Sequence, residues 1–404
     1  MPAEDARRRI VYVQPNSEVG GSDIALLRMV AALDRDRYEA VVVLPGEGPL
    51  VPLLREAGAG IRLLPMMQLR TLPSVSYQAR YLARFWPTVW ALRRVIREER
   101  ADLVYTNSLY ALYGGFAARF AGCPHLWHVR EIPPAVPVAR PALARMVMAL
   151  SRRVVSMTEA CSSGLFGPEG AHHPRIRILA EGLDLDLWSP GRHAGRDIRA
   201  ELGIAPDALV AGFVARLDPW KGLDVFLDAA AEVAARFPQA VFLVSGDAPA
   251  GFEAYRERMV AKAAALGLGD RLRFLGWRYR LADIPALMAS LDVFCHTSVQ
   301  PEPFGLVLIE AMAMGCPVIG AAAGGPIEIT ERGTSGMLTP PGDASALAEA
   351  ISTLFADPAR RRDLAAAGRA RVEAQYSLSG FRDRVHALYD DALYGDALGD
   401  ENRA

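Results

Sequence analysis

The amino-acid sequence predicts an α/β fold with two doubly wound domains, each built on a parallel β-sheet that is covered by helices on both faces. The chain has 404 residues, which is long enough for two domains of ordinary size. Its content of 51% hydrophobic and 23% charged residues is typical of a globular protein and excludes a disordered tail or a fibre. Short apolar runs alternate with helical stretches in both halves, as buried parallel strands and their crossover helices do.

Continuous β-branched and aliphatic runs predict seven strands in the first half and six in the second. The first seven are residues 9–15, 40–45, 61–65, 102–108, 125–131, 153–158 and 176–180. The other six are residues 209–217, 240–247, 271–277, 292–298, 317–321 and 336–339. Open sheets of this kind bind ligands beyond the carboxyl ends of their strands, so we look for site residues there.

Glycine and proline residues interrupt the pattern between residues 181 and 196, which indicates a connection between the domains. The predicted amino-terminal domain is residues 1–190, and the predicted carboxyl-terminal domain is residues 191–376. Apolar residues at helical spacing after Ser377 predict a terminal helix within residues 377–404.

The overall charge and the cysteines narrow the classes of partner and compartment. A formal net charge of −1 gives the whole chain no nucleic-acid signature. The four cysteines are far apart and show no C-x-x-C spacing, so we expect no zinc site and a reducing compartment. Neither a signal peptide nor a convincing membrane span is visible, and we therefore expect a cytoplasmic protein.

Positive charge is concentrated between residues 62 and 153, a segment that contains 14 arginines but only four aspartate or glutamate residues. The arginines are interleaved with Trp86, Trp90 and other large apolar residues, a pattern typical of reversible anchoring at an anionic membrane surface. The alternative is a pair of ordinary helices whose Trp and Met residues face the core while the arginines face water, with the first helix broken at Pro87. If it does not meet a membrane, the basic patch is a solvated surface or serves a soluble anionic acceptor.

Glu302 and Glu310 are separated by seven residues, and they carry the most specific motif of the chain. A helix that opens near Phe304, Gly305 and Leu306 would offer unpaired backbone N–H groups to an anion. The two carboxylates can accept hydrogen bonds from the hydroxyls of a sugar and of a ribose. The alternative is a solvated pair on a helix surface, but Glu310 lies in an apolar run where an unpaired charge is costly.

Arg216 and Lys221 follow the apolar strand that is predicted at residues 209–217. Two cations five residues apart on the loop that leaves a strand can reach one diphosphate and neutralise it without a metal ion. Lys221 and Lys262 are the only lysines of the chain, so the choice of lysine here is unusual. A solvated loop is the alternative when the motif is taken alone.

Three further motifs are weaker. Gly20 and Gly21 follow the first strand and allow a backbone to approach a phosphate, but they lack the G-x-G-x-x-G spacing of dinucleotide sites. His128 lies near the end of a strand, where a lone histidine is more often packed than catalytic. Asp184 and Asp186 have the D-x-D spacing of a metal site, although alternating leucines favour a structural turn.

Together these motifs make the sequence similar to the retaining nucleotide-sugar glycosyltransferases of GT-B fold, specifically the large family four. The resemblance covers nearly the whole chain. It implies that Arg216 and Lys221 hold the donor diphosphate, that Glu310 holds the ribose, and that Glu302 with the backbone of residues 304–306 holds the transferred sugar. It also implies a terminal helix that crosses back onto the amino-terminal domain.

The resemblance also assigns roles in the first domain. His128 matches the family histidine near the reacting centre, and Gly20 and Gly21 approach the phosphates. Glu181 stands where many members carry asparagine, a departure that we expect to change only a turn.

The expected activity is transfer of a hexose or N-acetylhexosamine, with retention and without a metal or other cofactor, from a UDP- or GDP-sugar to a lipid-linked or glycan acceptor in bacterial surface-glycan synthesis. The alternative from another class is a noncatalytic nucleotide-sugar-binding or membrane-associated interaction protein. The donor and acceptor depend on loops such as residues 277–279, whose shape the sequence does not give.

Overall fold

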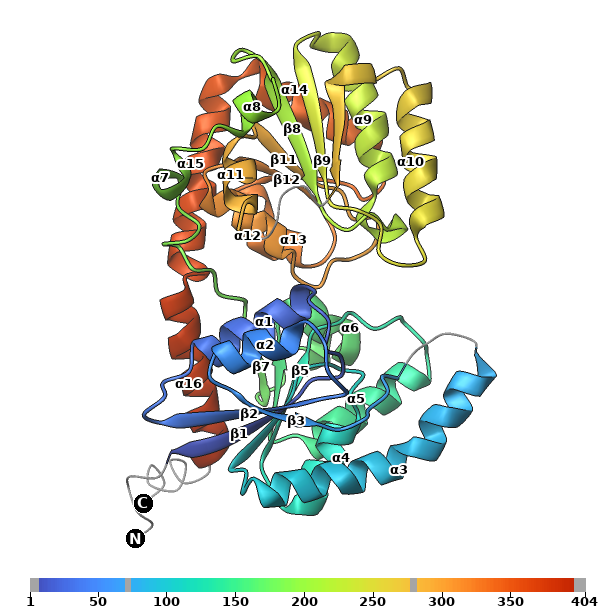
Figure 1. Cartoon of the computed structure of the whole chain (residues 1–404), viewed down its shortest axis with the longest axis vertical. Helices are drawn as coiled ribbons and strands as arrows, with labels where there is room; N and C mark the ends of the chain where they lie inside the picture. The colour runs from blue at the N-terminus through green and yellow to red at the C-terminus, as the bar shows by residue number, and fades with distance from the viewer. Residues whose placement is uncertain (1–6, 70–73, 277–281, 396–404) are drawn as a thin grey trace. The chain divides into compact units, whose positions relative to one another are not determined.

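The computed structural model describes residues 7–69, 74–276 and 282–395 (Figure 1). The chain forms two compact units, of which unit 1 is Met1–Gly182 together with Leu378–Ala404 and unit 2 is Leu183–Ser377. The division falls after Gly182, within the connection that the sequence indicates between residues 181 and 196. The loop at residues 277–279 lies outside the described residues.

Unit 1 is built on a seven-stranded parallel sheet with the strand order β3-β2-β1-β4-β5-β6-β7. The strands are β1 (Arg8–Val13), β2 (Tyr38–Leu44), β3 (Gly60–Leu63), β4 (Leu103–Thr106), β5 (His125–Val129), β6 (Arg153–Ser156) and β7 (Ile176–Ile178). The helices are α1 (Gly21–Ala31), α2 (Leu50–Glu56), α3 (Val75–Glu98), α4 (Tyr113–Ala121), α5 (Ala139–Leu150), α6 (Glu159–Gly170) and α16 (Leu378–Tyr394). The order of the strands reverses direction between β1 and β4, which makes their carboxyl ends the switch point of this sheet.

Alternate residues of β1 enter two separate apolar cores, one on each face of the sheet. Ile10 and Tyr12 pack with α1, α2 and α16, whereas Val11 and Val13 pack with α3 and α4. This two-sided burial is the reason that the strands have continuous apolar sequences.

The terminal helix α16 belongs to unit 1, although its sequence follows unit 2 (Figure 1). Its residues Phe381, Val385 and Leu388 are buried in the core above β1 and β2. The hydroxyl groups of Tyr12 and Tyr389 also form a hydrogen bond of 2.7 Å inside this core. The helix is therefore an integral layer of unit 1.

Helix α3 continues through Pro87, so the sequence alternative of a helix broken there is wrong. Proline removes one backbone hydrogen bond and costs about 3 kcal/mol inside a helix. Buried residues on both sides of the proline, such as Tyr81 and Leu92, anchor each half of α3 in the core and offset that cost.

Unit 2 is built on a six-stranded parallel sheet with the strand order β10-β9-β8-β11-β12-β13. The strands are β8 (Leu209–Val214), β9 (Ala240–Ser245), β10 (Leu272–Gly276), β11 (Val293–His296), β12 (Val318–Ala321) and β13 (Met337–Thr339). The α-helices are α7 (Pro190–His193), α8 (Ile198–Glu201), α9 (Leu223–Arg236), α10 (Glu253–Ala265), α11 (Ile284–Ala289), α12 (Leu306–Ala313), α13 (Gly325–Ile329), α14 (Ala344–Ala356) and α15 (Pro358–Gln375), and the short 3₁₀ helices are η1 (Pro219–Lys221), η2 (Gly269–Arg271) and η3 (Glu331–Gly333). The switch point of this sheet lies between β8 and β11.

Candidate active site

An ion pair between Lys221 and Glu302 marks the switch point of unit 2. Lys221 follows β8 and Glu302 follows β11, the two strands between which the strand order reverses. Their side chains meet with 2.6 Å between Nζ and Oε2, and both are largely buried. The structure thus joins two motifs that are 81 residues apart in the sequence.

The loops after β8 and β11 approach each other closely at Gly222. This residue has a φ of +68°, and a Cβ atom on it would lie 2.1 Å from the carbonyl oxygen of Thr297. The hydroxyl of Thr297 donates to the carbonyl oxygens of Lys221 and Gly222, both at 2.9 Å. Only glycine fits this contact, which fixes the backbone from which Lys221 projects.

Glu302 receives two further polar contacts that the sequence did not predict. Ser298 Oγ donates to Glu302 Oε2 at 3.0 Å, and His296 Nε2 lies 3.4 Å from the same oxygen. Burial favours the neutral carboxyl, but the hydrogen bond from His296 and the charge of Lys221 outweigh it and hold the pKa of Glu302 well below its ordinary value. Glu302 is therefore a buried, ionised carboxylate.

Arg216, the second predicted cation, is much more accessible than Lys221. Its side chain is 59% exposed, and its Nη2 lies 3.6 Å from Asp218 Oδ2. Asp218 also caps η1 by accepting from the backbone N–H of Lys221 at 3.3 Å. Arg216 can therefore move toward an anionic ligand at the cost of one long ion pair.

Helix α12 begins directly after Gly305, which has a φ of +104°. Phe304 is buried against Tyr376 with 5.9 Å between ring centroids, so its backbone rather than its ring is available to a ligand. Leu306 is the first helical residue, where backbone N–H groups lack intrahelical partners. Glu310 is buried on this helix, which rules out the alternative of a solvated glutamate pair.

The backbone of Glu302 is held by Gly324 and Gly325, which are the N-cap and the first residue of α13. The N–H of Gly325 donates to the carbonyl oxygen of Glu302 at 2.8 Å. A Cβ atom on Gly324 would lie 2.2 Å from that oxygen, so the close approach requires glycine.

Gly20 and Gly21 stand at the amino terminus of α1 in unit 1, beside the β1/β4 switch point. Gly20 is the N-cap residue, and its N–H donates to Asp23 Oδ2 at 2.9 Å. The side chain of Asp23, three residues along the helix, therefore stabilises the glycine turn.

His128 lies on β5 and is buried. Its Nδ1 forms a 2.7 Å hydrogen bond with the hydroxyl of Tyr105, whereas its Nε2 has no partner among the described residues. Burial, reinforced by the positive charge of Arg130, lowers the pKa of His128 well below its ordinary value. The imidazole is therefore neutral, and it belongs to unit 1 whereas Lys221 and Glu302 belong to unit 2.

Glu181 does more than change a turn, and that expectation is wrong. Its Oε1 lies 2.5 Å from Arg130 Nη1, and both side chains are buried. Arg130 Nε also donates to Asn107 Oδ1, and Asn107 donates to Gln14, which donates to Asp23. This buried network connects Glu181, near the end of the first segment of unit 1, to the glycine turn. Only one indication of the network was visible in the sequence, which was the unusual identity of Glu181.

Asp184 forms the structural turn that the sequence favours. Its Oδ1 accepts from the backbone N–H groups of Asp186 and Leu187 at 3.0 and 3.1 Å. Within the described residues, no group of three or more His, Cys, Asp or Glu side chains could hold a metal ion.

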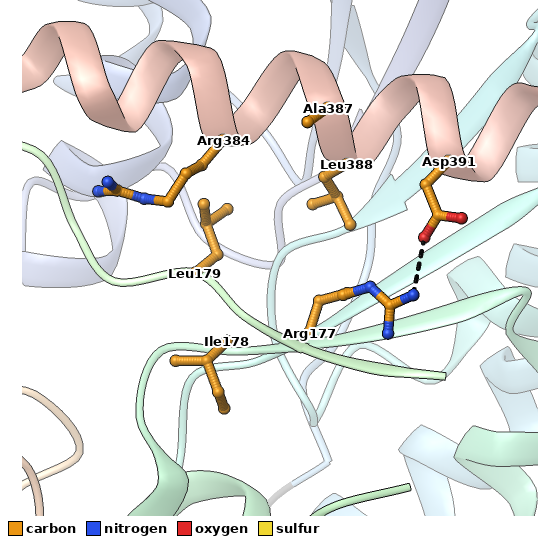
Figure 2. A pocket seen from close by; sticks show the side chains of 7 residues that line it. All are labelled: Arg177, Ile178, Leu179, Arg384, Ala387, Leu388 and Asp391. Carbon is orange, nitrogen blue, oxygen red and sulfur yellow. Dashed lines mark ion pairs between the residues drawn. The ribbon is translucent and has the colours of Figure 1, made fainter. Parts of the chain in front are cut away.

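A cavity of about 280 Å³ lies between β7 and α16 and is lined by Arg177, Arg384 and Asp391 among others (Figure 2). Arg177 and Asp391 form an ion pair of 3.4 Å across it. None of the predicted site residues lines this cavity, so we do not assign it to the candidate active site.

Both units match models of known protein families. Residues 195–371 match the model described as "Glycosyl transferases group 1", and residues 20–182 match a "Glycosyl transferase 4-like domain". Two parallel-sheet α/β units, each of which matches a glycosyltransferase family model, are the architecture of the GT-B fold. The chain belongs to the glycosyltransferase group 1 family.

Curated relatives include D-inositol 3-phosphate glycosyltransferases. The chain is 37% identical to that of Rhodococcus jostii (strain RHA1) over 57% of this chain and 50% of the relative. It is 28% identical to that of Actinosynnema mirum over 89% of this chain and 90% of the relative. The match to the relative from Geodermatophilus obscurus covers 56% of that relative. As with the Rhodococcus relative, the chain therefore spans only about half of the relative's length.

Solved structures confirm the predicted GT-B fold. Anabaena Alr3699/HepE in complex with UDP matches with a TM-score of 0.80 and 28% identity over 95% of this chain and 100% of that chain. The same protein in complex with UDP-glucose matches with a TM-score of 0.78 over 95% and 99% of the two chains. Sucrose-phosphate synthase from Thermosynechococcus elongatus, at 23% identity and a TM-score of 0.75, shares the fold over 96% of this chain and 100% of that chain.

Proposed function

We propose that the protein is a metal-independent, retaining glycosyltransferase. It moves a hexose or N-acetylhexosamine from a UDP- or GDP-sugar to a lipid-linked or glycan acceptor in bacterial cell-surface polysaccharide or glycolipid synthesis. The observation that carries the proposal is the buried pair of Lys221 and Glu302 at the β8/β11 switch point. The complexes of Alr3699/HepE with UDP and UDP-glucose support a nucleotide-sugar donor.

In this proposal unit 2 holds the donor. Arg216 and Lys221 bind the diphosphate, and Glu310 accepts from the ribose hydroxyls. Glu302 and the backbone of residues 304–306 bind the sugar. The burial of Glu302 and the exposure of Arg216 support this division, because a fixed carboxylate suits a sugar and a mobile cation suits an arriving diphosphate.

Unit 1 contributes His128 near the reacting sugar, and Gly20 and Gly21 let the backbone approach the phosphates. Because burial keeps His128 neutral, its Nε2, which has no partner in the described part of the chain, can accept or donate a hydrogen bond without adding charge. The Gly20 turn is already braced by Asp23, which supports a preorganised phosphate approach.

The chemistry follows from the charges. Cleavage of the bond between the anomeric carbon and the phosphate oxygen produces an oxocarbenium-like sugar and a nucleoside diphosphate. The cations Arg216 and Lys221 stabilise the leaving diphosphate. The acceptor hydroxyl bonds to the anomeric carbon on the face that the diphosphate leaves, and its proton goes to the departing phosphate oxygen, so the configuration is retained.

A donor screen tests this function. The protein is incubated with UDP- and GDP-sugars, each with lipid-linked acceptors, glycans or D-inositol 3-phosphate, and the products are identified by mass spectrometry and NMR. We expect one donor to be consumed and the anomeric configuration to be retained. Binding without turnover of any donor would instead support a noncatalytic nucleotide-sugar-binding protein, and clean inversion would contradict the mechanism.

We further propose that the protein works in the cytoplasm, peripherally on the inner face of the cell membrane. Helices α3 and α4 carry an exposed apolar surface formed by Leu82, Trp86, Trp90 and Phe120, whose exposed fractions are 69, 48, 51 and 40%. The tryptophans do not face the core, so the alternative with inward-facing tryptophans is wrong. Among the described residues, no helix is both long and apolar enough to cross a bilayer.

Arginines accompany this apolar surface. Trp90 stacks on Phe120 with 5.2 Å between centroids, and the Arg93 guanidinium lies 5.5 Å from the Trp90 ring. Stacked aromatic rings beside cations suit the boundary between anionic headgroups and acyl chains, with about 1 kcal/mol gained per basic residue near the surface.

Sedimentation with vesicles tests the membrane contact. Binding should rise with the fraction of phosphatidylglycerol, fall with salt, and weaken when Arg93→Glu and Arg94→Glu are combined. The matched control combines Arg360→Glu and Arg362→Glu, the same change of charge on exposed residues of α15 in unit 2. No binding to anionic vesicles at low salt would contradict the membrane contact and favour a soluble anionic acceptor.

A further inference from the structure

Two polar residues beside Glu302 have no role in the proposed function. His296 is the last residue of β11, and Ser298 follows it in the loop that leads to Glu302. Both are buried, His296 at 5% and Ser298 at 1% exposure. Buried polar side chains are costly unless they are hydrogen-bonded, so we expect His296 and Ser298 to have a role at the switch point.

Both residues contact the same atom of Glu302. Oε2 accepts from Lys221 Nζ at 2.6 Å and from Ser298 Oγ at 3.0 Å, and it lies 3.4 Å from His296 Nε2. His296 Nε2 is also 3.3 Å from Ser298 Oγ. The other oxygen, Oε1, has no hydrogen bond or ion pair among the described residues.

The tautomer of His296 follows from its partners. Nδ1 is buried without a partner in the described part of the chain, whereas Nε2 faces an ionised carboxylate. A hydrogen on Nε2 lets the ring donate to Oε2 and leaves no buried N–H unpaired. Nε2 of the ring is therefore a donor aimed at Glu302 Oε2.

We propose that His296 and Ser298 are positioning residues, which hold Glu302 through Oε2 so that Oε1 accepts a hydrogen bond from a hydroxyl of the transferred sugar. This inference rests on the proposed function of Glu302 as the sugar ligand. It adds His296 and Ser298 to the residues that affect how the sugar of the donor is bound, and it predicts no effect on how the nucleotide is bound.

Lys221 alone does not keep Glu302 in place. The glutamate lies in a loop, and the ammonium of Lys221 sits on a flexible four-carbon stem that the proposed function also engages with the diphosphate. His296 has only two side-chain torsions and projects from the end of a strand, and Ser298 is held in the same loop. Two rigid donors therefore keep the carboxylate in one orientation while the lysine responds to the phosphates.

The test compares the effect of each substitution on the nucleotide with its effect on the sugar nucleotide. The two pairs of ligands are UDP with UDP-glucose and GDP with GDP-mannose. The dissociation constant of each nucleotide is measured by calorimetry, and donor consumption is measured with the acceptor that the donor screen identifies. The variants are His296→Leu, His296→Gln, His296→Asn and Ser298→Ala. Glutamine places its amide where Nε2 lies, whereas the shorter asparagine does not reach, so the pair is matched in chemistry and differs in reach.

We expect His296→Leu to lower kcat/KM for the sugar nucleotide about tenfold and Ser298→Ala to lower it about threefold, with the affinity for the nucleotide unchanged within about twofold. Glutamine at position 296 should recover most of the loss and asparagine should not. An equal loss of nucleotide affinity, full activity of His296→Leu, or equal recovery by asparagine would overturn the inference. If the wild-type protein neither binds nor consumes any of the four probes, the proposed function itself fails and this inference fails with it.

Discussion

At the residue scale, Lys221 can be tested against the only other lysine of the chain. Replacing Lys221 by alanine removes the cation proposed to stabilise the leaving diphosphate and leaves the buried Glu302 without its counter-ion. We expect kcat to fall at least tenfold, which corresponds to about 1.4 kcal/mol of the barrier. Steady-state turnover at saturating donor measures the effect.

Lys262→Ala is the matched control. Lys262 forms an ion pair of the same length, 2.6 Å, with Asp228 on α9, but it lies on α10 and away from the switch point. Its loss should leave turnover unchanged. Wild-type turnover in Lys221→Ala, or an equal loss in both variants, would contradict the role of Lys221.

The buried pair of Arg130 and Glu181 should govern the stability of unit 1. Glu181→Leu leaves the Arg130 guanidinium buried without a counter-ion, and removal of one partner from such a pair costs about 3–5 kcal/mol. The double variant Arg130→Met with Glu181→Leu removes both charges and should recover much of that loss. Urea unfolding monitored by circular dichroism gives the free energies of unfolding of the wild type, the two single variants Arg130→Met and Glu181→Leu, and the double variant, and additive losses would show that the two charges are independent.

At the scale of a single element, β5 should make stability depend on pH. Burial lowers the pKa of His125 from 6.5 to about 3, and burial lowers that of His128 as well. Below pH 6.5 the unfolded chain binds protons that the folded chain does not, so stability falls as the pH falls, by up to about 1.4 kcal/mol per pH unit for each histidine.

Unfolding midpoints in urea at pH 7, 6 and 5 measure this slope. His125→Gln keeps a hydrogen-bonding group near Thr106 but removes one titrating ring, and the slope between pH 6 and pH 5 should become shallower. The exposed His172→Gln is the control and should leave the slope as it is. An unchanged slope in the β5 variant would mean that His125 does not resist protonation.

Helix α16 should stabilise unit 1 specifically. Phe381 is buried in the core of unit 1 and packs against Gly182, so Phe381→Ala should cost about 3–5 kcal/mol of unfolding free energy. Hydrogen exchange followed by mass spectrometry should show faster exchange in residues 7–182 and little change in residues 183–377. Equal loss of protection in both segments would contradict a local effect.

The strands were the most predictable elements, because a strand buried on both faces must be apolar throughout. Each of the 13 predicted strands coincides with an observed one, with ends that differ by a few residues. The expectation that the helix is broken at Pro87 was wrong because the continuity of α3 depends on distant contacts and not on the local sequence. Local sequence shows the missing hydrogen bond of a proline, but it does not show the core contacts of Tyr81 and Leu92 that hold the helix together across it.

The candidate site was predictable only in part. The spacing of Glu302 and Glu310 and the cations after β8 could be read because each motif is local. The network from Glu181 to Asp23 could not, because its members come from different loops that meet only when the sheet forms. His296 and Ser298 are close to Glu302 in the sequence, but the sequence does not show that both side chains turn toward the same carboxylate oxygen. Glu181 illustrates the limit, since its unusual identity was visible and its partner was not.

At the scale of the whole molecule, turnover should survive removal of divalent metal ions. Arg216 and Lys221 supply the positive charge that a metal would otherwise bring to the diphosphate, so exhaustive treatment with EDTA should change the rate less than about twofold. Continuous assay of nucleotide release, with and without added Mg²⁺ or Mn²⁺, measures this. Complete loss that either ion restores would require a metal-dependent mechanism.

The position of α16 has a consequence for synthesis on the ribosome. Unit 2 is one continuous stretch, whereas unit 1 needs the last helix of the chain to cover its core. Residues 7–182 therefore emerge first with the apolar face around Tyr12 and Tyr38 open, while unit 2 completes its fold behind them. We therefore expect unit 1 to complete its core only after residues 378–394 have left the exit tunnel, which reverses the usual amino-to-carboxyl order of domain folding.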